Sequence, residues 1–232
     1  MTAWSGPTVC LVTDRSRLPP VAVTTDDPPD EARLLDPLLE RLGLAADAGI
    51  DLLQIREPDV SGRGLFDFVQ RLRHRTEGTA AKLIVNDRLD VALAAEADGV
   101  HLKEESIPTP LARRIVPAGF LVGRSVHGVD AACKAEAEGA DYLIFGTVFA
   151  TGSKPAGHRT AGLEGLRAVA GAVRIPVLAI GGISLNTAAL AAASGAAGVA
   201  AIGLFFDGAG PPDDLRGRLA GTVTSLRRAF ER

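Results

Sequence analysis

Two short segments of the sequence combine residue types that can move protons and bind anions. His127 lies two residues after Ser125, at the end of an apolar run. An imidazole titrates near neutral pH, so His127 is the candidate general acid or base, with a purely structural hydrogen bond as the alternative. Thr151, Ser153 and Lys154 offer two hydroxyls and a cation within four residues. That combination suits a phosphate or a carboxylate, although a solvated surface loop has the same composition.

A glycine pair indicates a phosphate site. Gly181 and Gly182 follow another apolar run and precede an alanine-rich stretch that is typical of a helix. Glycine lets the backbone approach a phosphate closely, and the N–H groups at the start of a helix favour anions. Ile202 and Gly203, at the end of the next run, are expected to add backbone donors. A turn that only tightens the chain is the alternative.

Further polar residues end other apolar runs. Gln54 and Arg56 end one run and are predicted to bind substrate, as is Asn86 at the end of the next. Asp87 either meets a metal or a substrate amine, or caps the helix that follows. His101 ends a fourth run, where we expect a structural role.

Eight apolar runs alternate with longer helical patterns, such as those at 32–48 and 65–75. The runs cover residues 9–13, 52–56, 82–86, 99–102, 121–125, 142–146, 177–180 and 199–203. This alternation is typical of parallel βαβ units, and eight of them predict a single (β/α)8 TIM barrel over residues 1–232. Active sites of such barrels lie at the carboxyl ends of the strands, so the barrel would gather the polar residues in one pocket. A doubly wound open sheet is the alternative, but its fingerprint is missing.

Composition limits the partners. A net charge of −3 and 4% aromatic residues argue against nucleic acid and favour small molecules. Residues 175–206 contain no charged residue, but their Gly and Pro residues divide them into short elements, so we expect no membrane span. The N-terminus lacks the pattern of a signal peptide, which predicts a cytoplasmic protein.

A series of motifs carries a family resemblance. The segments LVTD, LLQIRE, LIVND, ADGVHL, GADYLIFGTVFATGSK, GLEGL and PVLAIGGI occur in this order. Together they resemble the thiamine phosphate synthase and TenI family over nearly the whole chain. The resemblance implies a barrel that binds a thiazole phosphate, with Gly182 and the last strand on the phosphate and Thr151, Ser153 and Lys154 near the reacting end. It is also compatible with a homodimer.

The family contains two activities, and two motifs of this chain depart from one of them. The synthase joins a pyrimidine methyl diphosphate to the thiazole phosphate and uses Mg²⁺ to neutralise the departing diphosphate. Its patterns resemble HLGQ.D and QLREK, whereas this chain has HLKEES and QIREP. Ser106 therefore stands in the place of a metal-binding Asp, Glu104 in the place of Gln, and Pro58 in the place of Lys. On the synthase interpretation Asp87 remains as a metal ligand.

The TenI branch includes thiazole tautomerases, which move a proton and need neither metal nor diphosphate. Residues 123–128, GRSVHG, resemble the motif that carries the catalytic histidine of this branch. The sequence therefore predicts a TenI-like thiazole tautomerase, an isomerase without metal or cofactor, with His127 as acid/base catalyst and Gln54, Arg56, Ser125 or Lys154 on the carboxylate. Thiamine phosphate synthase, with Mg²⁺ and Asp87, is the first alternative. A non-catalytic protein that binds thiamine intermediates is the second.

Overall fold

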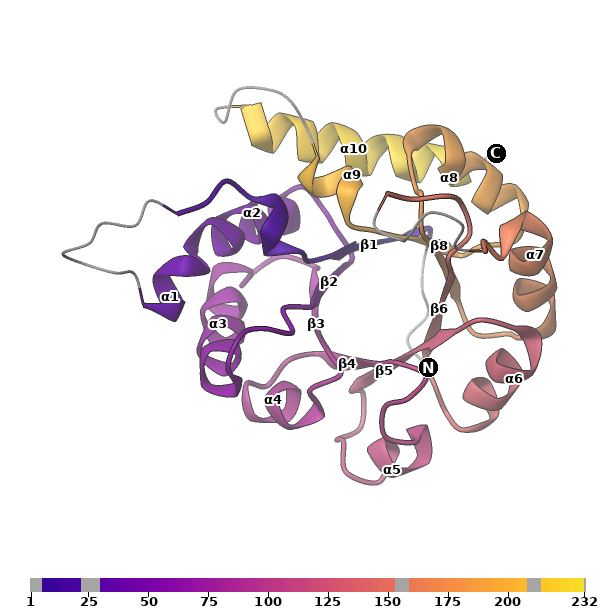
Figure 1. Cartoon of the computed structure of the whole chain (residues 1–232), viewed down its shortest axis with the longest axis horizontal. Helices are drawn as coiled ribbons and strands as arrows, with labels where there is room; N and C mark the ends of the chain where they lie inside the picture. Colours follow the sequence, from indigo (N-terminus) through magenta and orange to yellow (C-terminus); the bar gives the residue numbers. More distant parts are fainter. Residues whose placement is uncertain (1–5, 22–29, 153–158, 208–213, 232) are drawn as a thin grey trace.

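The computed structural model describes residues 6–21, 30–152, 159–207 and 214–231. Eight parallel strands form a closed barrel in which each strand pairs with the next and β8 pairs with β1. The strands are β1 (Thr8–Val12), β2 (Leu52–Ile55), β3 (Lys82–Asn86), β4 (Gly99–Leu102), β5 (Leu121–Val126), β6 (Tyr142–Gly146), β7 (Val177–Ile180) and β8 (Gly198–Ala201). Figure 1 shows this ring with the helices around its outside. The predicted (β/α)8 fold is confirmed.

The helices follow the strands in alternation. They are α1 (Glu31–Leu34), α2 (Asp36–Asp47), α3 (Gly62–Arg75), α4 (Leu89–Ala94), α5 (Thr109–Arg113), α6 (Val129–Ala137), α7 (Gly162–Ala172), α8 (Leu185–Ala193), α9 (Gly203–Phe206) and α10 (Leu215–Phe230), with a 3-10 turn at Arg15–Arg17. The helix expected at 32–48 is two helices that meet at Leu35. Pro37 lies in the first turn of α2, and a proline tolerates that position but not a helix interior.

The core has two layers. Alternate residues of each strand face either the barrel interior or the surrounding helices, so that in β1 Cys10 and Val12 pack inside while Val9 and Leu11 pack outside. Tyr142 fills the interior beside Gly123, where an added Cβ would lie 2.2 Å from the tyrosine ring. The aromatic ring closes this part of the interior, and polar side chains occupy the carboxyl ends of the strands above it.

None of the helices in the described ranges is long and apolar enough to cross a bilayer. The charge-free residues 175–206 instead form β7, α8, β8 and α9.

Candidate functional site

A cavity of about 850 Å³ lies at the carboxyl ends of the strands. Its lining includes the residues predicted from the sequence, namely Gln54, Arg56, Asn86, Ser125, His127, Thr151, Gly181, Gly182, Ile202 and Gly203. Ser153 and Lys154 lie outside the described residues. The volume is in the range of small-molecule sites, so the barrel gathers these side chains around a space large enough for an organic substrate.

A pair of amides forms one part of the cavity wall. Gln54 on β2 donates from Nε2 to Asn86 Oδ1 on β3 at 3.0 Å. Gln54 is 3% exposed, and its Oε1 has no hydrogen-bond partner in the described part of the chain. A buried carbonyl oxygen without a partner is costly, so Gln54 offers an acceptor for a ligand N–H or O–H group.

A buried histidine supports the next side chain around the ring. His101 on β4 is 1% exposed, and its Nε2 lies 2.8 Å from Ser125 Oγ on β5. Burial, reinforced by the charge of Arg124, lowers the pKa of His101 to about 3, so the ring is neutral at physiological pH. His101 lines the cavity and holds Ser125, which agrees with the structural role expected for it.

The hydrogen bonds of His101 indicate its tautomer. Nδ1 has no partner in the described chain. An unpaired buried N–H is rarer than an unpaired acceptor, so the proton belongs on Nε2, which donates to Ser125 Oγ. The Ser125 hydroxyl hydrogen is then available to a ligand in the cavity.

His127 follows β5 and has two polar neighbours. Its Nδ1 donates to the Gly146 carbonyl oxygen at 2.6 Å, and its Nε2 lies 3.8 Å from Glu104 Oε2. The side chain is 62% exposed. The Gly146 bond fixes the ring, so that Nε2 is the nitrogen left for a ligand.

The glycine pair and α8 form the opposite wall. Gly181 and Gly182 have φ values of +97° and +63°, and a Cβ on Gly182 would lie 2.5 Å from the Ala150 carbonyl oxygen. Only glycine fits there. The next residues start α8, where Ser184 Oγ accepts from Thr187 N at 3.2 Å. This capping box uses the N–H groups of Ser184 and Thr187, so the backbone that the cavity offers to a phosphate beside the helix start is that of Gly182 and Ile183, which line it.

A carboxylate with two partners lies beside the cavity. Asp87 follows β3 with a φ of +65°. Its Oδ2 lies 2.5 Å from Lys103 Nζ, and its Oδ1 accepts from the Ser106 hydroxyl. Partial burial raises the pKa of Asp87, but the bonds from Lys103 and Ser106 outweigh it and hold the pKa below its usual range. Asp87 is therefore ionised and already paired with a cation.

The sequence analysis did not identify Arg17 and Asp207, which form a charged cluster with Asp14 at the cavity rim. Arg17 Nη1 lies 2.5 Å from Asp207 Oδ1, and its Nε lies 3.2 Å from Asp14 Oδ2. All three residues line the cavity near Gly203. The only signal in the sequence is an arginine shortly after the first strand, which a surface loop also shows.

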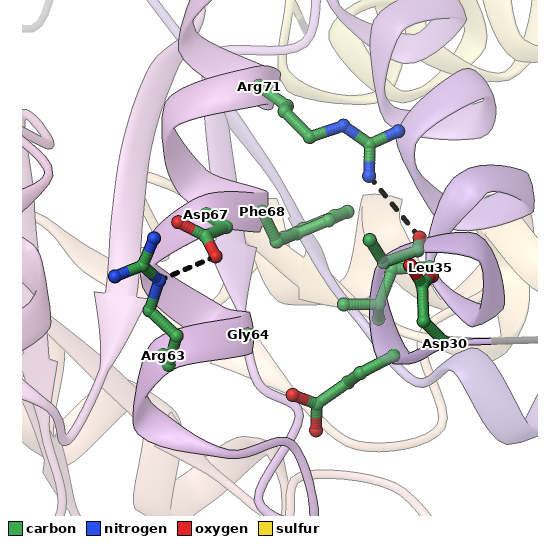
Figure 2. A pocket seen from close by; sticks show the side chains of 9 residues that line it. Asp30, Leu35, Arg63, Gly64, Asp67, Phe68 and Arg71 are labelled. Carbon is green, nitrogen blue, oxygen red and sulfur yellow. Dashed lines mark hydrogen bonds and ion pairs between the residues drawn. The ribbon is translucent and has the colours of Figure 1, made fainter.

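A second hollow of about 210 Å³ lies outside the barrel, between α1 and α3 (Figure 2). Its charged groups already have partners, because Arg63 Nε lies 2.8 Å from Asp67 Oδ2 and Arg71 donates to the Ala32 carbonyl oxygen at 3.3 Å. It contains none of the residues at the strand ends. We therefore place the functional site in the larger cavity.

Comparisons with known proteins identify the family of this chain. A family model described as thiamine monophosphate synthase matches residues 21–205. The thiamine-phosphate synthase of Methanoculleus marisnigri is 49% identical over 159 residues, which are 68% of this chain and 75% of that protein. That of Chlorobium luteolum is 35% identical over 231 residues, or 100% of this chain and 99% of that protein. A solved structure of a thiamine phosphate pyrophosphorylase from Pyrococcus furiosus superposes with a TM-score of 0.78 at 31% identity, covering 96% of each chain.

These relatives correct the predicted activity. The prediction of a TenI-like thiazole tautomerase, and with it that of an isomerase, is wrong, because proteins 35% and 49% identical to this chain are thiamine-phosphate synthases. The prediction rested in part on two loop positions, Ser106 and Pro58, which replace an Asp and a Lys of the synthase motifs. Neither change removes the cavity or its polar walls, and Lys103 places a cation at the rim.

The family match covers most of the chain, and one relative aligns with all of it. All but one of the motifs noted in the sequence contain a strand end that lines the cavity, and the remaining one, GLEGL, begins α7. The chain therefore belongs to the thiamine monophosphate synthase family.

Proposed function

We propose that this protein is a thiamine-phosphate synthase, a transferase that joins a pyrimidine methyl diphosphate to a thiazole phosphate. The thiazole nitrogen bonds to the methyl carbon of the pyrimidine while the bond from that carbon to the diphosphate oxygen breaks, and the diphosphate leaves with the electron pair. The observation that carries the proposal is the full-length similarity to synthases together with a cavity that has an anion-binding wall and a charged rim.

The two walls suggest how the substrates lie. The thiazole phosphate is assigned to Gly182, the start of α8 and Gly203, because backbone N–H groups there favour a phosphate. The pyrimidine is assigned to the Gln54–Asn86 pair, whose free carbonyl oxygen accepts from a ring substituent. The diphosphate is assigned to the side of Arg56 and Lys103, whose charges stabilise it as it departs.

Ser125 and His127 lie between these walls. In this proposal they contact the substrate and do not transfer protons. The two atoms that join exchange no proton, so an acid/base catalyst is not needed for bond formation. The Ser125 hydroxyl, held by His101, donates to the diphosphate, and His127 lies beside the same group with its ring fixed by the Gly146 carbonyl oxygen.

The donor set near Lys103 fits a magnesium ion that the substrate largely holds. No group of three or more Asp, Glu, His or Cys residues suited to a metal occurs among the residues the structure describes. Mg²⁺ commonly uses only one or two carboxylates and takes its other ligands from phosphates and water. Asp87 and the Ser106 hydroxyl would hold it, and when bound it would neutralise the departing diphosphate.

The proposed function is tested with the purified protein and both substrates, with Mg²⁺ or with EDTA. We expect thiamine phosphate and diphosphate in equal amounts, seen by phosphorus NMR, and a loss of both in EDTA. Binding of both substrates with no product would support the non-catalytic alternative and contradict the synthase.

Ser106→Asp is expected to tighten metal binding about tenfold, because it adds a second carboxylate beside Asp87. Mn²⁺ affinity is measured by the electron paramagnetic resonance of the free ion. Ser106→Asn has a similar shape without the charge and serves as the control. Equal affinities in both variants would show that position 106 does not face the ion.

A further inference from the structure

Asp87 has a fixed position and no oxygen without a partner. Its N–H donates to the His101 carbonyl oxygen at 2.8 Å, which ties the end of β3 to β4. Lys103 Nζ lies 2.5 Å from Oδ2, and Ser106 bonds Oδ1. A cation that approaches Asp87 therefore meets a carboxylate whose charge another cation already balances.

The segment that carries Lys103 and Ser106 is held independently of Asp87. Lys103 N donates to Ser106 Oγ at 2.8 Å. Arg124 donates to the Ile107 and Glu104 carbonyl oxygens at 2.8 and 3.0 Å. These bonds set the backbone, so the part that remains free to move is the long Lys103 side chain, which is 57% exposed.

Lys103 also lines the cavity, so its ammonium group has a choice of anions. An exposed ion pair contributes little stability, and a group of higher charge at the same rim can draw the lysine away. A diphosphate in the cavity is such a group. Once Lys103 turns to it, the Asp87 oxygen is available to a divalent cation.

We infer that Lys103 is a built-in competitor for the cation site on Asp87 and that a diphosphate group removes it. The lysine thereby makes cation and diphosphate binding cooperative, since each releases one partner of the Lys103–Asp87 pair for the other. This inference rests on the proposed function for the identity of the anion. It predicts weak metal binding to the protein alone.

The first test measures Mn²⁺ binding without any phosphate, by the resonance of the free ion. Lys103→Gln removes the competitor and is expected to tighten Mn²⁺ binding roughly three- to tenfold. Arg88→Gln is the matched control, because it removes the same charge one residue from Asp87 at a side chain that pairs with Asp90. No change in Lys103→Gln, or an equal change in Arg88→Gln, would overturn the inference.

The second test measures inorganic pyrophosphate binding in EDTA by calorimetry. Asp87→Asn frees Lys103 and is expected to tighten pyrophosphate binding roughly threefold or more. In the Lys103→Gln background the same Asp87→Asn substitution should give no gain in pyrophosphate affinity, because the freed lysine produces the gain. A gain that persists in the double variant would mean that only the lost negative charge matters, and the inference fails. Neither test involves turnover, so a protein that passes both and makes no thiamine phosphate would contradict the proposed function alone.

Discussion

Gly182→Ala is expected to weaken binding of the thiazole phosphate about a hundredfold. Gly182 has a φ of +63°, and a Cβ there would lie 2.5 Å from the Ala150 carbonyl oxygen and 2.7 Å from Phe149 Cβ. The first of these atoms is backbone and the second is attached directly to the backbone, so neither can turn away. The loop between β7 and α8 must therefore move. The displaced N–H groups would lose charge-assisted bonds to phosphate, each worth about 1.5–3 kcal/mol. Calorimetry with the thiazole phosphate measures the change.

The matched control is Gly195→Ala, which has similar backbone strain at the other end of α8. Gly195 has a φ of +89°, and a Cβ there would lie 3.2 Å from Ala170 Cβ, outside the cavity. Both variants are expected to lose roughly 1–2 kcal/mol of stability from the left-handed backbone, but only Gly182→Ala should lose phosphate affinity. Equal affinity in the wild type and Gly182→Ala would place the phosphate elsewhere.

The free energy of unfolding is expected to fall by about 2 kcal/mol between pH 7 and pH 5 because of His101 alone. The pKa of this histidine is 6.5 in a solvated chain and about 3 in the folded protein, where burial disfavours the charged ring. Between these values the unfolded chain binds a proton that the folded chain does not. Stability therefore decreases as the pH falls through this window.

Urea unfolding of the wild type and of His101→Gln at both pH values isolates this contribution, because the variant should lack the part of the pH dependence that His101 causes. The comparison with the variant is needed because Glu57 changes stability with pH in the opposite direction. Burial raises the pKa of Glu57, so at low pH the folded chain binds a proton more readily than the unfolded chain. If His101→Gln does not fold, the ring nitrogen shifts of the wild type provide the test. A charged His101 ring at pH 5 would refute the prediction.

The strands were the most predictable part of the fold. The expected runs at 82–86, 99–102, 142–146 and 177–180 coincide with β3, β4, β6 and β7. Strands buried on both faces appear in the sequence as continuous apolar runs that end at the first polar side chain. Their limits can therefore be predicted from the local sequence. The helix at 32–48 was less predictable because its leucine spacing continues across Leu35, while the helix itself restarts at Asp36 before Pro37.

The sequence predicted which strand-end residues line the cavity, but it did not predict which of the lining residues contact one another. Gln54, Asn86, Ser125 and Gly182 each lie within two residues of the end of a strand, and the rule that barrel sites occupy strand ends is enough to nominate them. The bond from His101 to Ser125 joins residues 24 positions apart, and that from Arg17 to Asp207 joins residues 190 positions apart. Such pairs depend on strand register and on closure of the ring.

The sequence by itself determined the eight βα units, the family and the residues at the strand ends that line the cavity, because apolar periodicity and motifs are local properties of the chain. The tertiary structure decided which of these residues are partners. The position of Ser106 was interpreted from its motif as the loss of a metal ligand, whereas in the structure it bonds Asp87 beside Lys103. The charge on a site is the sum over all the groups that the fold brings within a few ångströms, and a motif contains only those that are near in sequence.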